Sequence, residues 1–283
     1  MEDLTDILFD TIIDNLKIFP FLLVAYLLLE WLEKKTSPAS LAFIRKSGKY
    51  GPVVGSLCGI VPQCGFSVMA ANFYAAGIIT LGTLMAIFLS TSDEMLPILL
   101  SQSIPPKIIA TILAYKFLCG LIFGSLVDFA GKNKLNSVAI NSLCENEHCR
   151  CNEESGILKP AIYHSIKITL FIFAVSFIFN LAMENFADSA EVVAVLKTPL
   201  LGEMTSGIIG LVPNCSASII LTQLYIEGAI NISTMLSGTL VSGGVGILVL
   251  FRVNKHIREN IFIVFLLYLF GVTGGLISNL FAL

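Results

Sequence analysis

Two cysteines, Cys64 and Cys215, stand 151 residues apart in matching polar breaks of apolar segments. The first break reads Val-Pro-Gln-Cys-Gly-Phe-Ser over residues 61–67, and the second reads Val-Pro-Asn-Cys-Ser-Ala-Ser over residues 212–218. Thiolates favour soft metals and metalloids, whereas amide, carbonyl and carboxylate oxygens favour ions such as manganese. The two matching breaks together predict the substrate site of a transporter. The candidate ligands at this site are Gln63, Cys64, Ser67, Asn214, Cys215, Ser216 and Ser218. The alternative for each cysteine is a small buried side chain beside a helix break.

A second pair of breaks adds the only adjacent carboxylates that stand in a break. It reads Ser-Thr-Ser-Asp-Glu over residues 90–94 and Val-Ser-Gly-Gly-Val-Gly over residues 241–246. An ionisable group inside a membrane span is costly and is by default a functional candidate. The alternative is that Thr91 and Glu94 form a capping box that starts a helix. The substrate ligands predicted here are Thr91, Ser92, Asp93, Glu94 and Ser242, and the metal ligands predicted overall are Cys64, Asp93, Glu94, Asn214 and Cys215.

The composition of the chain indicates that these breaks belong to a membrane protein. Hydrophobic residues make up 55% of the 283 residues and charged residues 13%, with a mean hydropathy of +0.86. Six runs approach the roughly 20 apolar residues that a spanning helix needs: Leu16–Leu32, Ile78–Gln102, Ile104–Phe129, Ile162–Met183, Ala229–Phe251 and Ile261–Ala282. The acidic N-terminus is unlike a cleaved signal peptide, and the net charge of -3 gives no indication of a nucleic-acid partner.

The chain is internally duplicated. Residues 59–77 and 210–228 share seven identities in 19 positions, where ordinary residue frequencies give about one. We therefore expect a first membrane repeat over residues 1–130, a cytoplasmic Cys-containing linker over 131–159, and a second repeat over 160–283.

The positions of the basic residues predict how the two repeats are oriented. Each side of the first Pro-polar-Cys break offers only ten to twelve residues, which reaches about half of a 30 Å hydrocarbon core and fits a re-entrant hairpin. If neither hairpin crosses, the 12 of 17 basic residues that lie in Lys34–Lys49, Lys132–Lys159 and Arg252–Arg258 all fall inside, as cytoplasmic loops require. Each half then crosses three times, which gives an inverted-topology repeat with both termini outside and its site at the midplane.

The linker between the repeats carries three of the seven cysteines, within Cys144–Cys151. Three thiols and one histidine could hold a soft metal, but the spacing is not that of a standard zinc site. A plain connector with reduced thiols is the simpler interpretation, and the odd cysteine total argues against a disulfide framework.

These motifs resemble the ten-helix heavy-metal exporter family, whose members are labelled arsenic efflux proteins or manganese transporters. The resemblance lies in residues 61–67, 90–94 and 212–218, in Gln223-Leu-Tyr225, in Gly243–Gly246 and in Leu250–Arg252. It implies export of a metal or metalloid by an all-α protein. Ten helices agree with six spans, two of them broken, and two re-entrant hairpins that each count as two segments.

We therefore expect a secondary-active, multi-pass carrier in the cell membrane that exports a metal or metalloid ion, of the manganese or arsenic class, in exchange for protons through Asp93 or Glu94. The chain has no Gly-x4-Gly-Lys-Ser/Thr motif for ATP, no cofactor is expected, and the oligomeric state stays open. One alternative is a carrier of a small organic or inorganic anion, held by helix N-termini. A membrane thiol enzyme is the other, but no histidine lies in the spans near either cysteine to act as its base.

Overall fold

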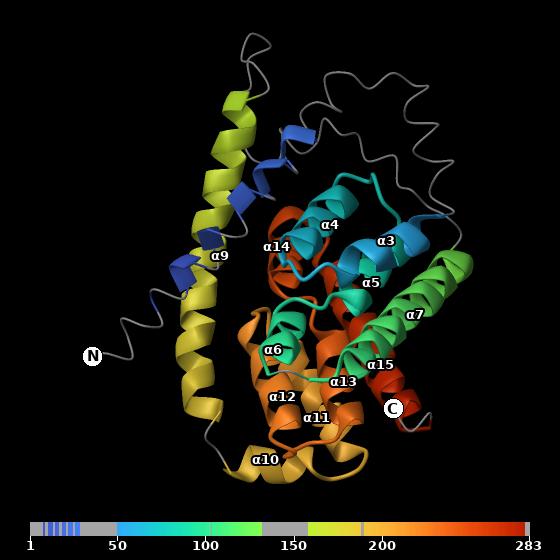
Figure 1. Ribbon diagram of the computed structural model, residues 1–283. Coiled ribbons are helices and arrows are strands. Elements are labelled where there is room, and N and C mark those ends of the chain that lie inside the picture. The colour runs from blue at the N-terminus through green and yellow to red at the C-terminus, as the bar shows by residue number, and fades with distance from the viewer. Residues whose placement is uncertain are drawn as a thin grey trace.

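The computed structural model describes scattered positions between residues 8 and 28, and then residues 50–102, 104–131, 158–187 and 190–280. All regular elements in these ranges are helices, without a strand (Figure 1). The described positions between 16 and 28, inside the first predicted span, are helical. The linker over 132–157, with its cysteine cluster, lies outside the described residues.

The first half holds two short helices followed by a broken span and a long helix. Helices α3 (Gly51–Ile60) and α4 (Gly65–Ala75) flank the first Pro-polar-Cys break, α5 (Leu81–Ser90) and α6 (Met95–Ser101) flank the carboxylate break, and α7 (Pro106–Ala130) is continuous. The break after α3 follows from Pro62, which has no N–H for a helix hydrogen bond. Helix α5 begins where the Thr80 hydroxyl accepts a hydrogen bond from the Thr83 N–H at 3.1 Å.

The second half repeats this order after two further helices. Helices α9 (Leu158–Ala187) and α10 (Ala190–Leu196) come first. They are followed by α11 (Leu201–Gly210), α12 (Ser216–Ile226), α13 (Ile232–Val241), α14 (Val245–Val253) and α15 (Ile257–Leu280). Both α12 and α13 begin 151 residues after α4 and α5 begin, so the predicted duplication extends to the local structure.

Five stretches of the described chain are long and apolar enough to cross a membrane: Leu81–Ser101, Pro106–Ala130, Ala161–Ile178, Ile232–Val253 and Ile257–Asn279. They coincide with five of the six predicted spans. Helices α3 and α12 are apolar but too short to cross a membrane. Segments that reach only half-way from a break have this length.

Each half forms a compact group of three helices, and further helices of each half pack against the other half. Helix α5 packs mainly on α3 and α7, and α13 packs mainly on α11 and α15. Helix α4, however, packs mainly on α14 of the second half, and α12 contacts α6 of the first. Figure 1 shows α4 beside α14 at one end of the molecule and α6 beside α12 toward the other. The breaks between these helices therefore meet in the interior.

Candidate metal centre

The two repeated cysteines lie side by side in the interior. Cys64 and Cys215 are the residues immediately before α4 and α12, and their sulfur atoms are 2.9 Å apart. Neither is in a disulfide, and their exposed fractions are 7% and 2%. The duplicated motif therefore brings its two thiols to one point from opposite halves of the chain.

Asp93 completes a group of three candidate ligands with these thiols. Its carboxylate and the two sulfur atoms all lie within 4.8 Å of one another. Asp93 is 3% exposed, and neither of its carboxylate oxygens has a hydrogen-bond partner. A buried carboxylate without a partner is costly, so this oxygen pair is available to a cation that enters between the thiols.

Asp93 and the residue at the matching position of the second half both have a positive φ angle. Asp93 has φ +24°, and Gly244, which stands 151 residues later, has φ +54°. A positive φ is easy for glycine and rare for other residues. A Cβ atom added to Gly244 would lie 2.6 Å from Asp93 Oδ2. The second half therefore also has a positive φ at this position but omits the side chain, which leaves room for the carboxylate of the first half.

Several predicted hydroxyl ligands bond to the backbone at the breaks. The Ser67 hydroxyl donates to the Cys64 carbonyl and the Ser218 hydroxyl to the Cys215 carbonyl, each at 2.8 Å. The Thr91 hydroxyl donates to the Ile87 carbonyl at 2.7 Å. Ser92 ties its own break to the end of α3, because its N–H donates to the Gly59 carbonyl at 3.2 Å. These residues shape the site through the backbone.

The remaining predicted residues lie at the margins of the three-ligand group. The Asn214 side chain donates to the Ser216 hydroxyl at 3.1 Å, and Gln63 is half-buried at the other tip. Ser242 is buried, and its hydroxyl has no hydrogen-bond partner. Glu94 is half-buried and lies outside the group of three.

The capping-box interpretation of Thr91 and Glu94 is wrong. Helix α6 begins at Met95, with Glu94 as its N-cap and no side-chain capping bond. Thr91 instead ends the preceding helix, α5, and its hydroxyl points back to Ile87. Four residues, 91–94, separate the two helices at this break, so Thr91 is too far back to cap α6.

Two buried charged residues escaped the sequence reasoning. Lys116, in α7, has no exposed surface and donates from Nζ to the Thr239 carbonyl at 2.8 Å. Glu203, in α11, is 2% exposed; it accepts a hydrogen bond from the Ser233 hydroxyl at 3.0 Å and leaves Oε2 without a partner. Each stands alone in an apolar segment, which is a signal that the sequence contains.

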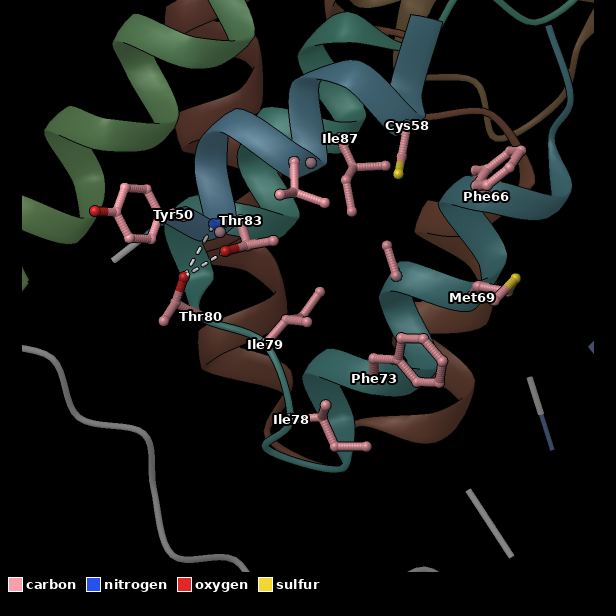
Figure 2. Close-up of a pocket in the computed structure, with 14 residues that line it drawn as sticks. Tyr50, Cys58, Phe66, Met69, Phe73, Ile78, Ile79, Thr80, Thr83 and Ile87 are labelled. Atoms are coloured by element: carbon pink, nitrogen blue, oxygen red, sulfur yellow. Dashed lines mark hydrogen bonds between the residues drawn. The ribbon is translucent and has the colours of Figure 1, made fainter. Parts of the chain in front are cut away.

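An apolar cavity of about 570 Å³ lies between α3, α4 and the start of α5, apart from the thiol pair. Figure 2 shows Cys58 and Ile87 on one side of it and Phe73 on the other, with Thr80 and Thr83 hydrogen-bonded at its edge. Neither Cys64 nor Asp93 lines it. The candidate metal centre and this cavity are therefore separate, and the cavity lies between α3 and α4.

Two thiols and one carboxylate form a donor set for a thiophilic ion. Binding replaces both S–H protons by the ion, so it releases protons and depends on pH. A tetrahedral ion with bonds of about 2.3 Å to sulfur holds two thiolates about 3.7 Å apart. The thiols, now at 2.9 Å, have to separate slightly when such an ion enters.

A comparison with protein-family models gives one match, over residues 3–195, to the family described as "Putative, 10TM heavy-metal exporter". The matched range covers the first Pro-polar-Cys break, the carboxylate break and α7. No curated protein sequence matches the chain, and no solved structure does.

Proposed function

The chain belongs to the heavy-metal exporter family whose model it matches, and from this premise we propose that it carries a thiophilic metal or metalloid ion out of the cytoplasm as a secondary-active transporter. The observation that carries the proposal is the buried group of Cys64, Asp93 and Cys215. Its two sulfur donors favour thiophilic ions over manganese. The family also supports a transporter rather than a membrane thiol enzyme.

We place the transport pathway at the meeting point of two inverted repeats with re-entrant hairpins. The repeated helix bounds support the duplication, and the packing of α4 on α14 and of α12 on α6 supports an exchange between the halves. In carriers of this design the site lies near the midplane, and one repeat rocks against the other. Here each thiol belongs to a different half, so movement between the halves would open and close the pair.

Proton exchange is the coupling we propose. An ion that binds through two thiolates displaces two protons, and the unloaded site takes them back. Asp93 and the neighbouring Glu94 provide further acidic groups at the same break. No nucleotide-binding motif is present in the chain, so the ion gradient is the simplest source of free energy.

The test measures cadmium and manganese flux in proteoliposomes that contain the whole chain. Replacing both cysteines, Cys64→Ser with Cys215→Ser, should abolish cadmium transport. Cys58→Ser with Cys119→Ser is the matched control and should leave transport unchanged, because these two thiols lie outside the group of three. Cadmium flux that survives the first pair of substitutions would contradict the proposed site.

A further inference from the structure

Glu203 is a buried carboxylate in the first turn of α11, and one of its two oxygens lacks a partner. Its side chain is 2% exposed. Oε1 accepts a hydrogen bond from the Ser233 hydroxyl at 3.0 Å, whereas Oε2 has no hydrogen-bond partner. Ser233 lies in the first turn of α13. Burying an ionised oxygen without a partner is costly, so this carboxylate is one interaction short.

The first repeat has a carboxylate at the start of the matching helix, and there both oxygens are bonded. Asp128, from α7, accepts a hydrogen bond from the Thr80 hydroxyl at 2.7 Å on Oδ2 and from the Gly82 N–H at 2.9 Å on Oδ1. Gly82 and Ser233 are matching positions, 151 residues apart. The first repeat therefore completes its carboxylate with protein donors, and the second repeat leaves one oxygen of Glu203 open.

Hydroxyl groups gather around this open oxygen. Four buried residues with hydroxyls lie where α11 packs on α13: Ser206, Ser233, Thr234 and Ser237. The Ser237 hydroxyl donates to the Glu203 carbonyl at 2.7 Å, and the Thr234 hydroxyl lies beside Gly202, since a Cβ atom there would be 3.3 Å from Thr234 Oγ1. A hydroxyl oxygen that donates its hydrogen keeps two lone pairs. Carboxylate and hydroxyl oxygens together are hard ligands, unlike the two thiols.

The charges on the neighbouring helices leave Glu203 as the single charge at this point. Helix α13 carries no charged residue. The charged residues of the other helices packed on α11 lie at helix ends: Glu191 in α10, Glu227 after α12, and Arg258 and Glu259 in α15. Lys197, before α11, is exposed, and Lys116 bonds to the Thr239 carbonyl at the opposite end of α13. One positive charge therefore neutralises the site, whereas a divalent ion would leave a costly uncompensated charge.

A plain capping role for Glu203 leaves the open oxygen unexplained. The starts of α11 and α13 both favour a negative charge, because the first N–H groups of a helix carry partial positive charge. This effect is small beside the cost of a buried carboxylate that lacks a partner. A proton on Oε2 would turn it into a buried hydroxyl, which needs a partner in its turn. Both roles therefore leave the deficit in place.

We propose that Glu203 and the adjacent hydroxyls, Ser233 first among them, bind a monovalent metal cation such as sodium. The carboxylate supplies the charge, and the hydroxyl oxygens supply further ligands. Residues 197–200 before α11 are exposed, so the ion reaches the first turn of α11 from water. The site shares no residue with Cys64, Asp93 and Cys215, and it stands whether or not the proposed function is correct.

The experiment measures binding of radiolabelled sodium to the purified full chain in nanodiscs, with thermal unfolding as a second readout. Choline chloride keeps the ionic strength constant. The unfolding temperature of the wild type should rise by about 3 °C for each tenfold increase in sodium above the dissociation constant. Glu203→Gln should weaken sodium binding by at least about 100-fold, and Ser233→Ala by about tenfold, the cost of losing a bond that orients a ligand.

Two controls separate this site from others. Glu227→Gln removes an exposed carboxylate close in sequence, and Cys64→Ser with Cys215→Ser removes the thiol pair; both should keep wild-type sodium binding. Gel filtration identifies the folded variants. The proposal is wrong if the wild type binds no sodium, if folded Glu203→Gln or Ser233→Ala binds sodium as tightly as the wild type, or if calcium displaces sodium at equal concentration. Loss of sodium binding in the cysteine variant would also contradict it.

Discussion

The carboxylate of Asp93 lies against the backbone of Gly244, the residue that holds the corresponding position of the second half. A Cβ atom on Gly244 would come within 2.6 Å of Asp93 Oδ2, and both residues have positive φ angles. Both halves therefore have a positive φ at this position, but only the first half has a carboxylate there.

Alanine at position 244 should destabilise the protein and disturb the site together. The change combines a strained φ of +54° with a clash against Asp93, whereas Gly228→Ala has a φ of +72° and nothing within 4 Å. The positive φ alone should cost about 1–2 kcal/mol in Gly228→Ala. In Gly244→Ala the backbone strain should cost about 1–3 kcal/mol, because a φ of +54° with a ψ of -147° is nearly exclusive to glycine. Thermal unfolding should therefore show a larger loss for Gly244→Ala, and cadmium binding should fall in that variant only. Equal losses in both would show that the carboxylate can move away freely.

Neutralising Asp93 should weaken ion binding far more than neutralising its neighbour. Asp93→Asn keeps the shape but removes the charge from the group with Cys64 and Cys215, and it should lower cadmium affinity by at least about 100-fold, since changes even outside the ligand shell cost about 10- to 100-fold. Glu94→Gln should have a smaller effect, because Glu94 lies outside that group. Titration calorimetry on both variants gives the comparison, and a reversed order would move the site to Glu94.

Mild oxidation should link Cys64 to Cys215 in the folded protein, since their sulfur atoms are 2.9 Å apart. Mass spectrometry of peptides should detect this link and no link between Cys58 and Cys119. Cadmium added before the oxidant should prevent it, because the metal occupies both thiolates. Linking that proceeds unhindered in saturating cadmium would argue that the ion binds elsewhere.

The predicted orientation can be tested by labelling single cysteines from each side of the membrane. Replacements of Lys46 and Lys255 should both react from the cytoplasmic side, because their basic neighbourhoods follow the positive-inside rule. A replacement of Lys197, in the short loop before α11, should react from the outside. Labelling of Lys46 and Lys255 from opposite faces would exclude the inverted arrangement.

The sequence was sufficient to predict the interruptions of the helices and the three residues that meet there, Cys64, Asp93 and Cys215. Pro62 and Pro213 have no N–H to donate to a helix hydrogen bond, so each interrupts its helix. Because the two breaks share a sequence motif, Cys64 and Cys215 could be matched from the sequence alone. The inverted orientation of the repeats and the coupling to protons stay predictions.

What the sequence could not give depends on contacts between distant helices. The capping box failed because Thr91 bonds back to Ile87, a choice between two local partners that the motif leaves open. Lys116 finds its hydrogen-bond partner only because α13 places the Thr239 carbonyl beside it, 123 residues away. Glu203 likewise needs Ser233, 30 residues away. A lone charge in an apolar run signals importance, but its partner is set by packing.

The exchange of helices between the halves has a consequence for how the protein is made. Helices α4 and α6 leave the ribosome long before α14 and α12, on which they pack. During synthesis the early pair must therefore wait, with polar breaks unpartnered, until the last quarter of the polypeptide arrives. A truncated product ending before α11 would be left with an incomplete core, which makes it a natural substrate for membrane quality-control proteases.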